Sequence, residues 1–339
     1  MSASAGPVDG TVLAPTPGDG IEPLSAPPTF SIVIPAYQAA ETIGAALRSA
    51  LAQTHPAHEI IVVDDGSTDD LDAALAPFAD SITLVRKENG GSASARNAGA
   101  AVATGDFLAI LDADDSYHPR RLETLAHLAS ARPDLDLITT DARFMAGTEP
   151  VGSFLAHNPF ATSGQRAAIL ASCFVGGWPA VRLTRLREVG LFDESLAVGH
   201  DWDAWLRLIL DGSLAGMVDR PYYDYQLSSG GLTSRRIASL WDRVRLLEKA
   251  RANPELEPGE RALLRGSLRN HRSRAVLAEV QESIYGSGRR RRLPRRAACR
   301  GIAPRARLAA VLALIAPPLA RRLVPDEHPG EHGLAAGAS

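Results

Sequence analysis

The chain has 339 residues, enough to bury one sizeable core with extensions or two modest domains. Its net charge of −3 combines an acidic first two-thirds with nine arginines between residues 289 and 307. Two distant cysteines, Cys173 and Cys299, provide neither a disulfide framework nor a metal-site spacing, which favours a reducing compartment. We find no signal peptide and no run of about 20 apolar residues, so we expect a cytoplasmic protein.

Strands and helices are predicted to alternate along most of the chain. Residues 1–28 are rich in Pro, Gly, Ala and Ser, which predicts a disordered N-terminal segment. We predict strands over 30–34, 59–63, 82–85, 106–111, 135–140 and 222–225, and helices over 40–52, from Ser67 onward, and over 92–102, 119–130, 184–189 and 201–211. This alternation predicts an α/β domain over residues 29–234 with a doubly wound, mostly parallel sheet. Residues 235–339 are predicted to form a helical, arginine-rich C-terminal extension.

Three aspartates cluster after the apolar run 107–111. Asp112, Asp114 and Asp115 are expected at the carboxyl end of a buried strand, where open α/β sheets bind their ligands. Carboxylates this close together repel one another unless a cation lies among them, so a hard divalent ion bridging to phosphate oxygens is the candidate ligand. The alternative is a polar turn in which one aspartate caps the helix near Pro119, and it accounts for one aspartate but not for three.

A glycine-rich loop and a helix precede this strand, in the sequence Asn89-Gly-Gly-Ser-Ala-Ser-Ala-Arg-Asn-Ala-Gly99. Backbone N–H groups of Gly90 and Gly91 at a helix start offer an anion site, and Arg96 is placed to neutralise a diphosphate. The alternative is an arginine on an exposed helix face. No G-x-G-x-x-G follows the first strand, which disfavours a Rossmann dehydrogenase.

In this order, the loop, the helix and Asp112-Ala113-Asp114 resemble the family 2 glycosyltransferases, inverting enzymes of GT-A fold with a DxD motif. The resemblance covers roughly residues 29–233. It implies transfer of a sugar from a nucleoside-diphosphate sugar to a hydroxyl of a glycan, glycolipid or cell-surface polysaccharide precursor, by metal-assisted single displacement. It also implies that Asp112 and Asp114 hold Mn²⁺ or Mg²⁺.

Two further segments match the family's nucleotide-binding motifs. Pro35-Ala36-Tyr37 is similar to a P-x-Y/F-N element beside the nucleobase, although Gln38 replaces the asparagine. Asp64-Asp65-Gly66-Ser67 is similar to a DDGS element, whose aspartate contacts the base or ribose. A carboxylate suits a base that presents an N–H donor between two carbonyls. The resemblance therefore implies nucleotide contacts at Pro35, Ala36, Tyr37, Glu41, Asp64, Asp65, Gly91, Arg96, Asp112 and Ala113.

Gly199-His200-Asp201-Trp202-Asp203 resembles the start of the family's acceptor-side helix, with His200 where an acid is commoner. The family's catalytic base maps to Asp201, since a positioned carboxylate can deprotonate the attacking hydroxyl. Asp201 would also suit the helix dipole as a first-turn residue. The acceptor side is expected to include Gly177, Trp178, His200 and Trp202, although the Trp202 and Trp205 rings are expected in the core.

Other functions stay open at this point. A sugar nucleotidyltransferase would need a GxGxRLxPxT-like loop where Ile34-Pro35-Ala36-Tyr37 stands. A non-catalytic nucleotide-binding adaptor is disfavoured because Asp65, Asp112, Asp114 and Asp201 occur together. The family's later Y-R-x-H element is degraded, however, because Gln226 and Ser228 replace its arginine and histidine.

The arginine run is followed by an apolar stretch over 308–316 that ends at Pro317. This stretch is too short to span a bilayer, and it predicts either a peripheral contact with anionic lipid at the inner face of the membrane or a basic helix packed on the catalytic domain. Nucleic-acid binding is not expected, because aromatic residues are not interleaved with the arginines.

Overall fold

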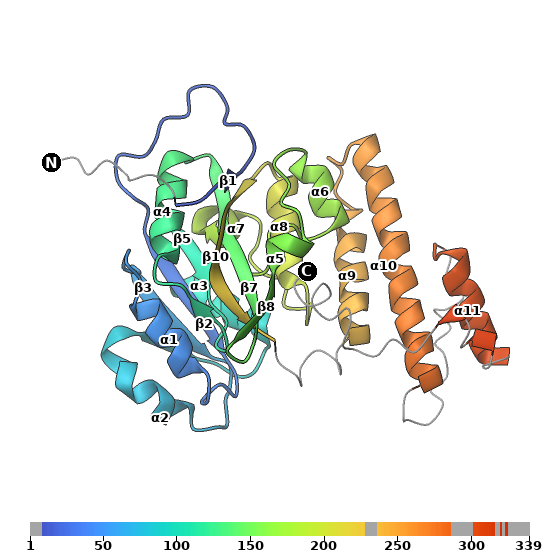
Figure 1. Ribbon diagram of the computed structural model, residues 1–339, viewed down its shortest axis with the longest axis horizontal. Coiled ribbons are helices and arrows are strands. Elements are labelled where there is room, and N and C mark those ends of the chain that lie inside the picture. The colour runs from blue at the N-terminus through green and yellow to red at the C-terminus, as the bar shows by residue number, and fades with distance from the viewer. Residues whose placement is uncertain (1–8, 228–235, 286–300, 316–318, 321–322, 325–339) are drawn as a thin grey trace. The chain divides into compact units, whose positions relative to one another are not determined.

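The computed structural model describes residues 9–227, 236–285, 301–315, 319–320 and 323–324 (Figure 1). The chain divides into two compact units, of which the first ends at Leu227 and the second spans residues 228–337. The expected domain boundary at residue 234 falls outside the described residues.

One mixed sheet runs through the first unit. Its strands are β1 (Val12–Leu13), β2 (Phe30–Ala36), β3 (Glu59–Asp64), β4 (Thr83–Arg86), β5 (Phe107–Ile110), β6 (Ser116–Tyr117), β7 (Leu135–Ala146), β8 (Glu149–Ser153), β9 (Ala180–Arg182) and β10 (Leu214–Gln226). They lie in the order β1-β10-β7-β9-β5-β2-β3-β4, with β6 beside β10 and β8 beside β7. The predicted parallel pairing is confirmed for β4-β3-β2-β5 and holds for β7 with β10, whereas β9 runs antiparallel between the two groups.

The helices of this unit are α1 (Ile43–Leu51), α2 (Leu71–Leu75), α3 (Ser92–Val102), α4 (Arg121–Ala131), α5 (Phe154–His157), α6 (Gln165–Ala171), α7 (Leu183–Glu188) and α8 (His200–Leu210), and a 3-10 helix covers Ala76–Ser81. The predicted helices correspond to α1, α2, α3, α4, α7 and α8. The short elements β8, α5, α6 and β9 lie in a region where the sequence has little periodicity, and they were not predicted.

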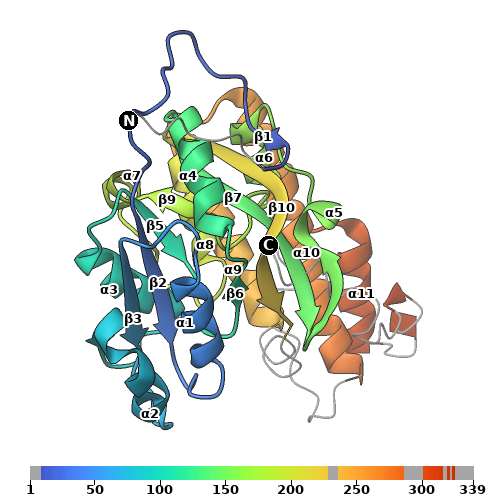
Figure 2. The ribbon, with the colours of Figure 1, turned by 60° about the vertical axis from the view of Figure 1, so that its left-hand side comes forward.

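The central strands are buried on both faces. Residues 30–34 of β2 and 107–111 of β5 and its end are all buried, as expected for parallel strands covered by helices. From β2 the chain runs through α1 to β3, which pairs with one side of β2. After β4 it runs through α3 to β5, which pairs with the other side of β2 (Figure 2). Because the strand order reverses at β2, the carboxyl ends of β2 and β5 border the position where open α/β sheets bind ligands.

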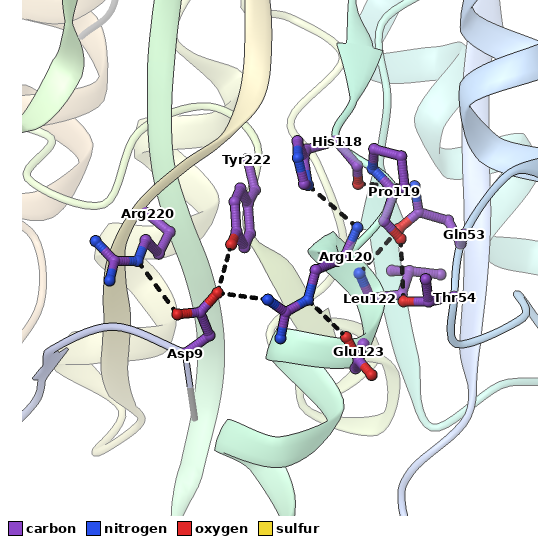
Figure 3. A network of polar contacts seen from close by, with 10 residues as sticks. All are labelled: Asp9, Gln53, Thr54, His118, Pro119, Arg120, Leu122, Glu123, Arg220 and Tyr222. Atoms are coloured by element: carbon purple, nitrogen blue, oxygen red, sulfur yellow. Dashed lines mark hydrogen bonds and ion pairs between the residues drawn. The ribbon is translucent and has the colours of Figure 1, made fainter. Parts of the chain in front are cut away.

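The segment before β2 is ordered from residue 9 onward, which corrects the prediction of disorder for residues 9–28. Strand β1 pairs antiparallel with β10 at Met217 and Val218. The Asp9 carboxylate accepts hydrogen bonds from the Tyr222 hydroxyl at 2.8 Å and from Arg120 Nη1 at 2.7 Å, and it lies 3.6 Å from Arg220 Nε (Figure 3). These side chains come from elements more than one hundred residues downstream, so composition alone gave no sign of the contacts.

The second unit is helical, as predicted for the C-terminal extension. It contains α9 (Arg236–Ala250), α10 (Pro258–Tyr285) and α11 (Pro304–Ile315). Helix α11 packs against α10 through Ala309 and Ala310, while Leu308 and Val311 are exposed. Residues 286–300, with most of the arginine run, lie outside the described residues. Among the described helices, none combines the length and the apolar character that a bilayer span requires.

Candidate active site

The three clustered aspartates have different environments. Asp115 is buried, and its carboxylate accepts hydrogen bonds from the Tyr223 hydroxyl at 2.7 Å and from Gln226 N at 2.8 Å. The same hydroxyl accepts a hydrogen bond from Asp112 N at 3.3 Å. Burial, with Asp112 and Asp114 nearby, raises the pKa of Asp115 well above its usual value. Asp115 therefore fixes the loop to the end of β10, whereas Asp112 and Asp114 are more accessible.

A buried arginine, Arg121, packs against aromatic side chains next to this loop. The Arg121 guanidinium lies over the rings of Tyr117 and Tyr223, at 4.7 and 5.1 Å from their centroids. It donates to the Trp178 carbonyl at 2.6 Å and to the Thr140 hydroxyl, and burial lowers its pKa. Sequence reasoning missed this residue because an arginine in the first turn of an amphipathic helix is typical of a solvated face.

Arg96 of α3 joins the aspartate cluster to α8. Its Nη2 lies 2.8 Å from Asp112 Oδ1. The side chain is only 5% exposed, so the alternative of an exposed helix face is wrong. Burial opposes the charge of Arg96, but the carboxylates of Asp112 and Asp201 outweigh this effect and raise its pKa. The guanidinium thus lies within the field of carboxylates from two distant parts of the chain.

The two accessible aspartates fit a divalent ion that also has phosphate or water ligands. Burial and the neighbouring Asp112 raise the pKa of Asp114, which means that two negative charges here repel each other. Within the described part of the chain, no group of three or more potential metal-ligating side chains is assembled. Mg²⁺ and similar ions are commonly held by one or two carboxylates together with substrate phosphates.

Asp65, at the end of β3, fixes the glycine-rich loop. Its Oδ1 accepts hydrogen bonds from Gly90 N at 2.9 Å and Lys87 Nζ at 2.7 Å, and its Oδ2 accepts one from Gly91 N at 2.7 Å. The side chain is almost fully buried. The N–H groups that we expected to bind a phosphate are therefore paired with a carboxylate of the protein. A phosphate that used them would have to displace Asp65.

The loops after β2 and β3 are joined side by side. The Gln38 amide donates to Thr68 Oγ1 at 2.9 Å and accepts from Thr68 N at 2.9 Å, and Asp64 Oδ1 accepts from Ser67 N at 2.8 Å. Pro35 and Ala36 pair in register with the end of β3, and the Tyr37 side chain next to them is exposed. Glu41 is also exposed, before α1. The predicted base-binding residues thus lie at or just after the carboxyl ends of β2 and β3, and the Tyr37 ring is open to solvent.

Asp201 lies in the first turn of helix α8. The helix begins after Gly199, whose φ of 79° is left-handed. Asp201 Oδ1 accepts from Trp202 N at 2.7 Å. A Cβ placed on Gly177 would lie 2.8 Å from Asp201 Oδ2, so these two predicted acceptor-side residues are neighbours. A glycine at this position leaves room for the carboxylate.

The predicted acceptor-side tryptophans are buried. Trp202 Nε1 donates to the Ile169 carbonyl at 2.9 Å, and Trp205 Nε1 donates to the Gly176 carbonyl at 2.9 Å. Both rings belong to the core, as expected. Trp178 is also buried, stacked on Tyr223 with centroids 5.2 Å apart. Trp178 and Trp202 therefore support the site from within instead of offering a surface to an acceptor.

Asn97, next to Arg96, ties α3 to the loop before α8. Its side chain donates to the Phe192 carbonyl and to Glu194 Oε1, both at 2.9 Å, and accepts from Phe192 N at 2.9 Å. The Arg96 guanidinium lies over the Phe192 ring at 5.9 Å. His200 is buried beside the same ring. Arg96 and Asn97 thus contact both Asp112, after β5, and the segment that precedes α8. Ser228 of the degraded element lies outside the described residues.

Known proteins resemble the chain in both sequence and structure. A model described as glycosyl transferase family 2 matches residues 31–188. An uncharacterized glycosyltransferase of Rickettsia typhi is 31% identical over 210 residues, covering 59% of this chain and 62% of that protein. The succinoglycan biosynthesis protein ExoU of Rhizobium meliloti is 31% identical, covering 56% and 59% respectively. The chain thus spans less than two thirds of the length of these curated relatives.

Two solved structures have the same architecture. One is S. aureus TarS 1-349 in complex with UDP-GlcNAc, with a TM-score of 0.59 at 18% identity, covering 84% of this chain and 87% of that chain. The other is the mannosyltransferase PcManGT from Pyrobaculum calidifontis in complex with GDP-Man and Mn²⁺, with a TM-score of 0.57 at 20% identity, covering 92% and 87%. This likeness concerns the fold, which is GT-A. Residues 31–188 therefore match glycosyltransferase family 2, and the chain is similar to glycosyltransferases over this region.

Proposed function

We propose that the protein transfers a sugar from a nucleoside-diphosphate sugar to an acceptor hydroxyl, by single displacement with inversion. One observation carries this proposal. Asp112, at the end of β5, and Asp201, at the start of α8, both act on the buried Arg96. This shared partner supports the proposal that a donor diphosphate site and a general base act on one substrate, which a displacement requires.

Asp112 and Asp114 are the residues that would hold Mn²⁺ or Mg²⁺. When bound, such an ion neutralises charge that develops on the diphosphate leaving group. Arg96 adds a fixed positive charge at the same place. Tyr37, exposed just after β2, is the residue proposed to contact the nucleobase. Asp65 fixes the glycine-rich loop through Gly90.

Asp201 is proposed as the general base. Its Oδ1 is occupied by Trp202 N, so Oδ2, next to Gly177, is the oxygen proposed to take the proton. The acceptor oxygen then forms its bond to the anomeric carbon as the bond to the diphosphate breaks, and the proton of the hydroxyl passes to Asp201. A single displacement inverts the configuration of that carbon.

The relatives support the choice of substrates. The TarS and PcManGT structures hold UDP-GlcNAc and GDP-Man, the second with Mn²⁺. ExoU is named for succinoglycan biosynthesis, which supports a glycan, glycolipid or lipid-linked polysaccharide precursor as the acceptor class. A substrate screen would identify the sugar and the base of the donor.

The proposal is tested by the anomeric configuration of the product, read by NMR, after a screen of nucleotide sugars with Mn²⁺ or Mg²⁺. Asp201→Asn should retain donor binding and lose transfer by roughly 10²- to 10⁴-fold. Asp114→Asn should lower turnover by at least about a hundredfold, and EDTA should abolish it. Asp211→Asn, on an exposed carboxylate just after the same helix, serves as the control and should be neutral. Retention of configuration would refute single displacement.

A further inference from the structure

The loop from Asp112 to Asp115, here called the aspartate loop, is held by the hydroxyls of two buried tyrosines. Tyr117 of β6 donates a hydrogen bond to the Ile110 carbonyl at 2.6 Å, just before the loop. Tyr223 of β10 donates to Asp115 Oδ2 at 2.7 Å and accepts from Asp112 N at 3.3 Å. The Tyr223 hydroxyl therefore contacts the first and the last aspartate of the loop at once.

The rings of these two tyrosines are fixed by their neighbours. They meet edge to face with centroids 5.6 Å apart, and the Trp178 ring stacks on Tyr223. The Arg121 guanidinium lies 4.7 Å from the Tyr117 centroid and 5.1 Å from the Tyr223 centroid. None of these four residues is more than 4% exposed. Side chains packed this closely keep one rotamer, so the position of each hydroxyl is set.

Arg121 carries a charge that packing alone does not require. Its described hydrogen bonds run to the Trp178 carbonyl and the Thr140 hydroxyl, and its Nε has no partner among the described residues. An apolar side chain of similar volume would fill this space without the cost of burying an ion. What the guanidinium adds is attraction to the faces of two rings whose hydroxyls hold the aspartate loop.

The anchoring of Asp115 decides which side chains of the aspartate loop are accessible. Asp115 is buried with both oxygens occupied, Oδ2 by the Tyr223 hydroxyl and Oδ1 by Gln226 N. Asp114 is exposed and Asp112 is partly exposed. Because only a few bonds of the backbone separate the three carboxyl groups, a shift of Asp115 would also move the other two.

We propose that Tyr223 is the positioning residue for the metal-binding pair Asp112 and Asp114. Arg121 holds the Tyr223 ring, and the Tyr223 hydroxyl holds the loop. The inference rests on the proposed function, in which this pair holds the divalent ion. Without the hydroxyl, Asp115 would keep a buried oxygen with no partner, and the loop would have to shift or admit water. Groups that orient metal ligands typically contribute roughly 10- to 100-fold to metal affinity.

The test is Mn²⁺ binding to the full chain, followed by electron paramagnetic resonance of the free ion, with and without UDP or GDP. Tyr223→Phe keeps the ring and removes the hydroxyl, and it should weaken Mn²⁺ binding by at least about tenfold. Excess Mn²⁺ should restore nucleotide binding in this variant, because only the affinity for the ion is lowered. Arg121→Lys keeps the charge but not the planar group, and should weaken Mn²⁺ binding too. Combined with Tyr223→Phe it should add little, since both changes act through the same hydroxyl.

Tyr222→Phe is the matched control. Tyr222 is the neighbouring residue of β10, and its hydroxyl also donates to a carboxylate, that of Asp9, at 2.8 Å (Figure 3). This hydrogen bond is made with the N-terminal segment and not with the aspartate loop. The control should therefore keep the Mn²⁺ affinity within about twofold of the wild-type value.

Unchanged Mn²⁺ affinity in folded Tyr223→Phe protein would overturn the proposal. Equal losses in Tyr223→Phe and Tyr222→Phe would show a general loosening of β10, and would overturn it as well. If Tyr223→Phe does not fold, Arg121→Lys decides by the same measurement. If the wild-type protein binds no Mn²⁺ under any of these conditions, the metal site of the proposed function itself fails.

Discussion

Asp65→Asn is the sharpest test of how the nucleotide side of the site is built. The carboxylate accepts two backbone N–H bonds, from Gly90 and Gly91, and one bond from the Lys87 ammonium, all within 2.9 Å. Asparagine keeps the shape but leaves one acceptor oxygen, and it turns an NH₂ group toward a donor. A buried hydrogen bond to a charged group is worth about 1.5–3 kcal/mol. We expect the free energy of unfolding to fall by about 2–4 kcal/mol.

Urea unfolding followed by tryptophan fluorescence measures this loss, since Trp178, Trp202 and Trp205 are buried in the first unit. The matched control is Asp72→Asn, where the carboxylate is exposed and pairs with Arg86 at the surface. That change should stay within about 0.5 kcal/mol. Amide exchange at Gly90 and Gly91 should quicken in Asp65→Asn alone. A loss below about 1 kcal/mol would mean that the loop keeps its shape without the carboxylate, and the reasoning would be wrong.

Three further changes test other parts of the molecule. Gly99→Ala should cost about 1–3 kcal/mol in urea unfolding, because the new Cβ would lie 2.5 Å from Val33 Cγ1; an unchanged midpoint would mean that α3 shifts freely. Burial, and then Arg96, lowers the pKa of His200 to about 4 from an ordinary 6.5. The unfolded state thus binds more protons between pH 6.5 and 4, stability should fall as the pH drops through that window, and His200→Gln should flatten the slope. Glutamine at the four consecutive arginines 289–292 should abolish salt-sensitive pelleting with anionic vesicles, and wild-type protein that pellets equally with neutral vesicles would contradict an electrostatic contact.

The sequence predicted the elements whose signal is local. Helix α3 spans the predicted residues 92–102, and the apolar run before Asp112 forms β5, because burial on both faces leaves a continuous apolar pattern. The order of motifs along the chain was enough to predict the GT-A fold. The antiparallel β9 was not predicted, because a three-residue strand carries almost no periodic signal.

Contacts between side chains that are distant along the chain could not be predicted from the sequence. The Asp115–Tyr223 hydrogen bond joins residues 108 positions apart, and nothing in either local pattern marks the pair. Arg121 has the spacing of a surface residue, yet it is fully buried against aromatic rings. Asp65 was predicted at the site, but its pairing with the glycine-rich loop depends on how two loops meet, and this is set by packing of the sheet. The roles proposed for Asp201 and Asp114 stay predictions.

The pairing of β1 with β10 has a consequence for shortened versions of the protein. A strand at the edge of a sheet offers unpaired N–H and C=O groups to any other extended chain. Here residues 12–13 occupy that edge at Met217 and Val218, and Thr11 continues the contact through hydrogen bonds with Asp219. A protein trimmed to begin at Thr29, just before the family match, would expose this backbone. We expect it to self-associate edge to edge, even though every motif of the site would be retained.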